Sequence, residues 1–288
     1  MILSKEKFDL APLFIRLIIL STMSLKIFSW NINGYRDGIH EWLSEYIRTQ
    51  APDVIFLSET KKKPDFLKAK FDEFTDYEAI INSHTPWNYH GVAMLIRKNN
   101  TFSRIEVKMN IPTRKDTKTL EAADGRVIII WLNQKFFVVG SYTPNSGHSD
   151  PVKLAYRTQT WDPAFVLLLE QLRRAGPTAW IGDINVALAE TDVSNPVVMS
   201  TYAGFTLEER RNFWQLLNTG CWKDIWRDQH PDDQVFTWRG TSDPLKYGMR
   251  LDNIILSDNL VKDADETYMV YTCPKIADHI PICVNLKR

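Results

Sequence analysis

The stretch TAWIGDINVALAETD, residues 178–192, decides how the rest of the chain is interpreted. An apolar run, Ala179–Ile181, stops at Gly182, and Asp183 and Asn185 follow with one apolar residue between them. Side chains two residues apart in an extended strand lie on the same face. The spacing therefore has two interpretations: a turn that ends a buried strand, or one half of a catalytic site.

Length and composition predict one intracellular domain. The chain has 288 residues, of which 44% are hydrophobic and 24% charged, and no linker or repeat divides it. Its 35 basic and 35 acidic residues cancel, which argues against nonspecific coating of nucleic acid but leaves room for a local basic patch. The chain has three cysteines, Cys221, Cys273 and Cys283, which is an odd number without a paired spacing. This pattern indicates reduced thiols and no cysteine-based zinc site.

The first 22 residues are expected to form an extension upstream of a domain over residues 23–288, loosely ordered or packed on the surface. Residues 10–20 are apolar, but Arg16 interrupts the run, which is too short to span a bilayer. Glu6 and Asp9 count against a signal peptide. We therefore expect no membrane partner and an intracellular location.

Short apolar runs alternate with helical patterns along the chain. A hairpin is expected around Asn133 and Gln134, and Thr206 with Glu209 forms a capping box at a helix start. Strands are predicted over residues 25–30, 53–58, 91–97, 126–132, 135–142, 178–182, 251–257 and 280–286, and helices over 38–50, 164–176 and 206–220. Hairpins mixed with helices predict an α/β (α+β) protein with two mixed sheets flanked by helices.

Polar side chains gather at the ends of the predicted strands, where loops converge on functional sites in sheet proteins. These residues are Asn31, Asn33, Glu59, Tyr142, Asn145, Asp183, Asn185, Asp252, Asp278 and His279. Each alone is equally compatible with a turn, a solvated loop or a structural histidine. Their joint occurrence indicates a site.

The residue types favour metal-assisted phosphoryl chemistry. Mg²⁺ binds hard oxygen ligands and often takes only one or two carboxylates, a role that suits Glu59 with Asn31 beside it. Asp183 can orient or deprotonate a water, and Asn185 can position the water or the phosphate. His279 can contact phosphate oxygens, and Asp252 is its expected partner.

Seven blocks resemble the endonuclease/exonuclease/phosphatase family, and within it the exonuclease III-type apurinic/apyrimidinic endonucleases. They are WNINGYR, LSETK, SYTPNSG, GDINVA, AGFTLEERRNF, MRLDNIILS and DHIPI, between residues 25 and 286. The resemblance implies a four-layer α/β/β/α sandwich with two sheets face to face. It also implies Mg²⁺-dependent hydrolysis, with Mn²⁺ as an alternative ion, on the 5′ side of an abasic site, leaving a 3′-hydroxyl.

The resemblance also assigns roles to individual residues. Asn31, Glu59 and Asp278 become the candidate metal ligands, and Tyr142, Asp183, Asn185, Asp252 and His279 the candidate catalytic residues. Candidate substrate-binding residues are Asn33, Lys61, Asn145, Trp238 and Arg250, with Tyr247 as a further stacking group. Lys61 begins a run of three lysines, which is also compatible with an ordinary solvent-exposed surface.

The chain departs from the family pattern at several positions. Asn33 stands where some members carry aspartate, and Ala277 precedes Asp278 where serine is common. More consequentially, Met199 and Tyr202 occupy positions where DNA-contacting asparagines are usual, and Asn253 replaces an aromatic residue. The chemistry is expected to persist, whereas the DNA contacts and the balance between endonuclease and 3′ exonuclease action are expected to differ.

The leading hypothesis is a Mg²⁺-dependent, monomeric DNA-repair nuclease acting on double-stranded DNA with abasic or damaged sites. The alternatives are a phosphodiesterase or phosphatase of the same family acting on another phosphate, and a weakly active DNA-binding scaffold. The AGFTLEER block counts against the first alternative, and intact Glu59, Asp183, Asn185 and His279 count against the second.

Overall fold

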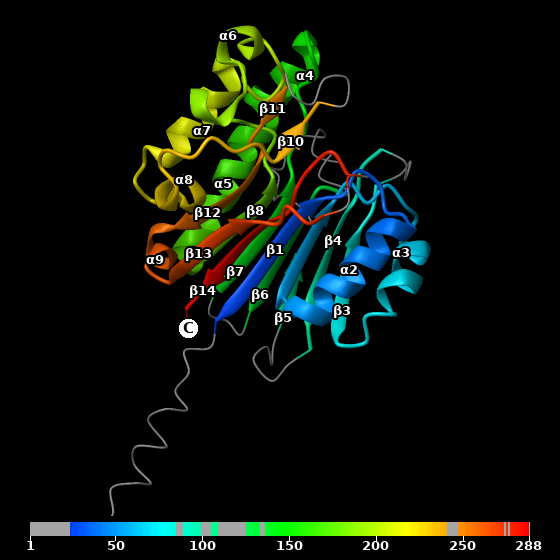
Figure 1. The fold of residues 1–288 in the computed structure, drawn as a ribbon. Coiled ribbons are helices and arrows are strands. Elements are labelled where there is room, and N and C mark those ends of the chain that lie inside the picture. Colours follow the sequence, from blue (N-terminus) through cyan, green and yellow to red (C-terminus); the bar gives the residue numbers. More distant parts are fainter. Residues whose placement is uncertain are drawn as a thin grey trace, which may run out of the picture.

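Two β-sheets packed face to face form the centre of the molecule (Figure 1). The computed structural model describes residues 24–84, 89–98, 105–108, 125–132, 136–240, 247–273, 275 and 277–287. Within these residues each of the two sheets has six strands. The first sheet, in spatial order, consists of β13 (Ala264–Met269), β14 (Ile282–Leu286), β1 (Leu25–Asn31), β2 (Val54–Ser58), β4 (Val92–Arg97) and β3 (Tyr77–Asn82). The second consists of β5 (Ile105–Lys108), β6 (Val127–Leu132), β7 (Phe136–Tyr142), β8 (Thr178–Asp183), β12 (Asp252–Ser257) and β9 (Trp222–Asp224).

Both sheets are mixed. β1 pairs with β2 in parallel and β7 with β8 in parallel, while the other strand pairs are antiparallel. The β6–β7 pair is the predicted hairpin, although its tip at Asn133 and Gln134 lies outside the described residues. The expectation of two mixed sheets is confirmed.

The core between the sheets is apolar and tightly packed. Phe56 of the first sheet and Val138 of the second belong to one buried cluster. A Cβ at Gly140 would overlap the Phe56 ring, and a Cβ at Gly182 would overlap the carbonyl oxygen of Ser141. Gly182 also has a φ of +131°, so glycine is required there for both the backbone conformation and the close approach of the β7 backbone, while Gly140 allows the two sheets to approach.

Helices cover the outer face of each sheet (Figure 1). A second cluster, which includes Trp30 and Leu43, joins the first sheet to α2 (Asp37–Gln50) and α3 (Pro64–Phe71). A third, which includes Trp180 and Phe165, joins the second sheet to α5 (Asp162–Ala175) and α7 (Leu207–Leu217). Helix, sheet, sheet and helix are therefore the four layers, and the predicted sandwich is confirmed.

Shorter elements occupy the connections, and several lie beside the candidate site. They are α4 (Pro151–Ala155), the π-helical segment η2 (Tyr156–Trp161), η3 (Glu190–Asp192), α6 (Pro196–Met199), α8 (Ile225–Gln229), β10 (Trp238–Arg239), β11 (Gly248–Met249) and α9 (Asp258–Val261). In the part of the chain that the structure describes, no helix has both the length and the apolar character needed to cross a membrane.

The element predictions hold where the local pattern is strong. The capping box at Thr206 and Glu209 starts α7, but the helix ends at Leu217, short of the predicted limit at residue 220. The predictions miss α3, β3 and β13 as well as several shorter elements. β3 and β13 are the two edge strands of the first sheet, and β13 has exposed polar positions and lacks a continuous apolar run. The extension over residues 1–22 lies outside the described residues, so it stays a prediction.

Candidate active site

Strand register brings the predicted polar residues to one edge of the sandwich. Asn31, the last residue of β1, is opposite Ser58, so that Glu59 follows directly beside it. In the second sheet Asp183, the last residue of β8, lies between Tyr142 of β7 and Asp252 of β12. The site therefore collects strand ends from both sheets.

Asn31 connects the two sheets at this edge. Its Nδ2 donates to Oε1 of Glu59 and to Oδ2 of Asp183, both at 2.9 Å. Its Oδ1 accepts a hydrogen bond from the backbone N–H of Asn33 at 3.1 Å. An amide has two N–H donors, and here both are used by carboxylates, so Asn31 sets the separation of Glu59 and Asp183.

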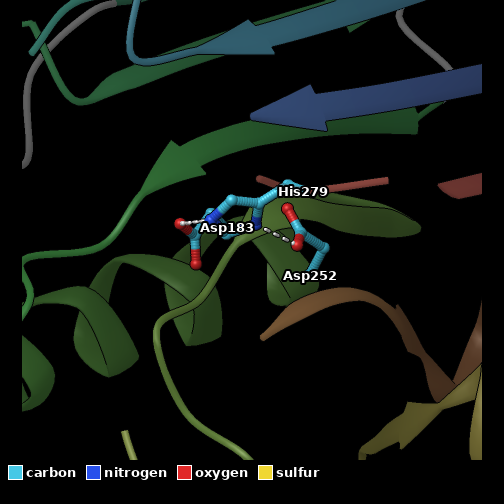
Figure 2. Close-up of side chains that lie close together, drawn as sticks. All are labelled: Asp183, Asp252 and His279. Carbon is cyan, nitrogen blue, oxygen red and sulfur yellow. Dashed lines mark hydrogen bonds and ion pairs between the residues drawn. The ribbon is translucent and has the colours of Figure 1, made fainter. Parts of the chain in front are cut away.

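His279 lies between two carboxylates (Figure 2). Its Nδ1 is 2.7 Å from Oδ2 of Asp252, and its Nε2 is 3.9 Å from Oδ2 of Asp183. A carboxylate can only accept, so Nδ1 donates to Asp252 and Nε2 faces Asp183. Burial alone would lower the pKa of His279, but the charge of Asp252 and its hydrogen bond outweigh burial and raise the pKa to about 10. The imidazole is therefore held as a cation at neutral pH.

Asp183 is an almost fully buried carboxylate with an unusual proton affinity. Burial raises its pKa to about 7, and the negative charge of Asp252 adds to the increase, while His279 opposes it. Its Oδ1 accepts from the backbone N–H of Asn185 at 2.9 Å. A carboxyl group that titrates near neutral pH is suited to accepting a proton from water.

Asn185 lies in a turn after β8 and not in an extended strand. Its φ is +51°, which corrects the expectation that Asp183 and Asn185 point to one face of a strand. Its Nδ2 donates to the carbonyl of Thr143 at 2.8 Å, and its Oδ1 accepts from Nδ2 of Asn145 at 3.0 Å. Asp183 thus both ends the strand through a turn and contributes to the cluster.

Arg157, which the sequence analysis missed, holds this turn. It lies in η2, is 2% exposed, and donates to the carbonyls of Ile184 at 2.8 Å, Asn185 at 3.3 Å and Pro144 at 2.8 Å. Its Nε also donates to Asp162 at 2.6 Å. One guanidinium therefore ties together the two loops that carry Asn145 and Asn185. The only sequence signal was an arginine a few residues before the helix predicted over residues 164–176, and arginines in such positions are common on surfaces.

Glu59 starts a second chain of polar contacts. Burial would raise its pKa, but hydrogen bonds from Asn31 and Lys61 outweigh burial and lower it. Lys61 Nζ lies 2.5 Å from Oε2 of Glu59 and donates to Oδ1 of Asn33 at 2.7 Å. Asn33 then donates to Asp278 at 3.0 Å, and Trp238 Nε1 donates to the other oxygen of Asp278 at 3.2 Å. All of these were predicted site residues, and the structure brings them together.

Tyr142 lies against the carboxylates with its hydroxyl protonated. Burial raises its pKa well above the usual range, and the charges of Glu59 and Asp183 raise it further. The guanidinium carbon of Arg126, a second residue that the sequence analysis missed, is 5.0 Å from the centroid of the Tyr142 ring, and Arg126 Nη1 donates to the Tyr142 carbonyl at 3.2 Å. The tyrosine is therefore a fixed neutral hydrogen-bond donor.

The site offers two sets of groups that can hold a divalent cation. Asp183, Asp252 and His279 each present one ligand atom, and these atoms lie within 4.8 Å of one another. In that set, however, Nδ1 of His279 is already hydrogen-bonded to Asp252. Glu59 and Asn31 form the alternative: the Glu59 carboxylate is a hard oxygen ligand whose present cation is the Lys61 ammonium, and Asn31 would join it through Oδ1 by turning its amide, because its Nδ2 now faces Glu59.

Arg250 is a correction to the predicted substrate contacts. It is 1% exposed, and its guanidinium pairs with Asp192 at 2.7 Å and Asp224 at 2.6 Å. Both carboxylates lie in the interior, so the guanidinium has no surface left for a substrate. Arg250 instead joins η3 and β9 to the start of β12.

Comparisons with known proteins find similar proteins over most of the chain. The model of the Endonuclease/Exonuclease/phosphatase family matches residues 28–279. A DNA-(apurinic or apyrimidinic site) endonuclease of Dictyostelium discoideum is 32% identical over 264 residues, covering 90% of this chain and 70% of that protein. An exodeoxyribonuclease of Bacillus subtilis is 28% identical, covering 90% of this chain and 98% of its own length. The crystal structure of an AP endonuclease from Leishmania major superposes with a TM-score of 0.80 at 23% identity, covering 92% of this chain and 88% of the other.

Proposed function

The chain belongs to the endonuclease/exonuclease/phosphatase family, and from that premise we propose that it is a Mg²⁺-dependent nuclease that cuts double-stranded DNA on the 5′ side of abasic sites. It is a hydrolase of the DNA-repair branch. Its product carries a 3′-hydroxyl, and the enzyme acts as a monomer on DNA inside the cell and trims 3′ ends as a secondary activity. The observation that carries the proposal is the amide of Asn31, which holds Glu59 and Asp183 on the two sheets beside the His279–Asp252 pair.

The proton chemistry is assigned to Asp183. With a pKa of about 7, its carboxylate accepts the proton of the attacking water at neutral pH. The water oxygen bonds to phosphorus as its proton passes to Asp183, the bond from phosphorus to the 3′ oxygen breaks, and that oxygen takes up a proton from solvent and leaves as the 3′-hydroxyl. Asn185 and Asn145, joined by a hydrogen bond of 3.0 Å, orient the phosphate beside it.

His279 and Tyr142 stabilise the negative charge of the phosphate. The imidazolium of His279, kept protonated by Asp252, and the neutral hydroxyl of Tyr142 both donate to the phosphate oxygens. A preorganised donor of this kind is typically worth about 3 kcal/mol of the barrier. Because both groups are fixed by contacts within the fold, no reorganisation is needed when the charge develops.

The metal is assigned to Glu59 and Asn31, with Asp278 joined to them through Asn33 and Lys61. Bound Mg²⁺ supplies positive charge that neutralises the phosphate and lowers the pKa of a coordinated water. Mn²⁺ has similar ligand preferences and is expected to substitute for it. The short contact between Lys61 and Glu59 supports the assignment, because it marks this carboxylate as the point where the site accepts a cation.

The test uses a duplex with one tetrahydrofuran abasic analogue, incubated with Mg²⁺ and then with excess EDTA. We expect incision 5′ to the lesion that EDTA and Asp183→Ala both abolish. A labelled recessed 3′ end in the same reactions measures the trimming activity. Equal cleavage of an undamaged duplex would instead make the protein a general nuclease, and turnover of a phosphoinositide without DNA cleavage would refute the DNA-repair assignment.

A further inference from the structure

An open groove lies on the outer face of the first sheet, between α2 and β13. Its volume is about 450 Å³, and its lining on α2 extends from Trp42 to Gln50, a length of about 12 Å. Its surface is mainly apolar, with the aromatic side chains of Trp42, Tyr46, Tyr268 and Tyr271 in its walls. Trp42 and Tyr268 pack on the cluster between α2 and the first sheet, so the groove lies on the helix side of this sheet and not between the two sheets.

The aromatic side chains of the groove are fixed in position and yet exposed. Trp42 donates from Nε1 to the carbonyl of Thr272 at 3.0 Å, and the hydroxyl of Tyr271 donates to Sδ of Met269 at 3.7 Å. Tyr271 is nevertheless 65% exposed, and Trp42 and Tyr268 are only partly buried. An exposed apolar surface with a preformed shape is typical of an interaction site.

The first described residue of the chain lies close to one end of this groove. Ser24 precedes β1, and Nζ of Lys26, the second residue of β1, donates to the carbonyl of Gln50 at 3.0 Å. Residues 21–24 span at most about 14 Å when extended, and a connection of this length is enough to reverse the direction of a chain. The segment that precedes them can therefore lie along the groove from its Gln50 end.

Residues 10–20 have the composition and the length to fill the groove. Their sequence, LAPLFIRLIIL, is apolar except for Arg16, and even in a helical conformation it would span about 16 Å. Among the described residues that line the groove the charged one is Glu45, which pairs with Arg48 at the surface. Glu266, two residues before the lining begins on β13, is a second exposed carboxylate. The single positive charge of the segment therefore has acidic partners at the groove.

We infer that residues 10–20 of this chain dock in the groove between α2 and β13 and cover its aromatic side chains. The apolar side chains of the segment then leave water together with those of the groove, and Arg16 lies at the rim, where Glu45 and Glu266 are exposed. The inference goes beyond the nuclease function and does not depend on it, because the groove shares no residue with the candidate active site.

Hydrogen–deuterium exchange of the full chain tests the docking from the side of the groove. Leu17→Asp places a negative charge in the segment, where it would face an apolar wall and Glu45, so the segment should leave the groove. We expect the backbone amides of residues 268–272 to exchange about 10-fold more slowly in the wild type than in this variant. Ser21→Asp adds the same charge outside the apolar run and should exchange like the wild type.

Limited digestion with trypsin tests the docking from the side of the segment. Cleavage after Arg16 should be about 10-fold faster in Tyr271→Ser, whose groove has lost an exposed ring, than in the wild type. Cleavage after Lys7, outside the apolar run, is the internal reference and should not change. Trp214→Ala, which removes a partly exposed aromatic residue from α7 on the other sheet, is the matched control and should leave both rates unchanged.

Equal exchange of residues 268–272 in the wild type and in Leu17→Asp would overturn the inference. Light scattering that finds a dimer in the wild type and a monomer in Leu17→Asp would also overturn it, because a second copy of the chain would then cover the segment. Cosedimentation with vesicles of phosphatidylcholine and phosphatidylglycerol that Leu17→Asp abolishes would equally overturn it, because the segment would then bind a lipid surface.

Discussion

Nδ1 of His279 and Oδ2 of Asp252 lie 2.7 Å apart, although the two residues adjoin strands of different sheets. Asp252 opens β12 in the second sheet, and His279 precedes β14 in the first. The carbonyl of His279 also accepts from Nε1 of Trp30 at 3.0 Å, which holds its backbone against β1. The packing of one sheet on the other therefore sets the geometry of the pair.

Replacing Asp252 should make the activity of the enzyme fall at high pH. In Asp252→Asn the main cause of the raised pKa of His279 is lost, while burial still lowers the pKa. The imidazolium is then lost at a lower pH, so the loss of kcat relative to wild type should grow from about 10-fold at pH 6 to about 100-fold at pH 9. The measurement is kcat across this range with saturating Mg²⁺.

Asp258→Asn is the control for this change, since Asp258 is an exposed carboxylate near Arg173 on the outer layer. A constant ratio of mutant to wild-type kcat at every pH would show that Asp252 does not act through the charge of His279.

Asp183 should make the unliganded protein less stable as the pH rises. Its folded pKa of about 7 lies above the unfolded value of about 3.9. Between these values the folded state binds more protons than the unfolded state, so stability falls with rising pH. Asp183→Asn cannot titrate, and its free energy of unfolding relative to wild type should therefore increase by about 3 kcal/mol between pH 5 and pH 8.

The measurement for Asp183→Asn is calorimetric or denaturant unfolding in EDTA, so that metal binding does not contribute. Only the pH dependence of the difference is predicted, because the new amide also faces the donor group of Asn31. A difference that stays level from pH 5 to pH 8 would place the pKa of Asp183 near its ordinary value.

Arg157→Lys should lower turnover more than substrate affinity. An ammonium group cannot reach three carbonyls and a carboxylate in the directions that the guanidinium does, so the turn at Asn185 loosens. We expect a fall in kcat of about 100-fold with little change in KM, because a small displacement of reacting groups costs this much.

The matched control for Arg157 is Arg173→Lys on α5, whose guanidinium pairs with Glu170 on the surface of the outer layer. Both variants are compared by circular dichroism at the assay temperature. If Arg157→Lys stays folded and keeps its kcat, Arg157 only stabilises the fold. Partial recovery of kcat in Arg157→Ala on addition of guanidinium would point to a positioning role.

Glu59→Gln should raise the Mg²⁺ concentration needed for activity. The substitution keeps the size of the side chain and removes the charge that a divalent ion requires, so the half-maximal Mg²⁺ concentration should rise about 10- to 100-fold. Titration of incision rate with Mg²⁺, supported by calorimetric binding of Mg²⁺ alone, measures this.

Glu73→Gln, a partly exposed glutamate that pairs with His40 and Lys70, is the control and should leave the Mg²⁺ dependence unchanged. An unaltered Mg²⁺ requirement in Glu59→Gln would move the metal to the alternative set of Asp183, Asp252 and His279.

The sequence alone predicted the elements whose signal is local. Continuous apolar runs such as Val54–Ser58 are buried strands, and Thr206 with Glu209 starts a helix, because these patterns depend on neighbouring residues. The residue types at the strand ends likewise predicted Glu59, Asp183 and His279 as one cluster.

Only the tertiary structure decided which polar groups face one another. Arg250 and Arg157 are both arginines next to predicted site segments, yet Arg250 is neutralised by buried carboxylates and Arg157 holds the turn at Asn185. The left-handed φ of Asn185 and the order of the strands depend on contacts between residues far apart in the chain. The sequence therefore determined the chemical groups of this protein, and the packing of the two sheets determined their distances, because hydrogen bonds across the sandwich form only when both sheets are in place.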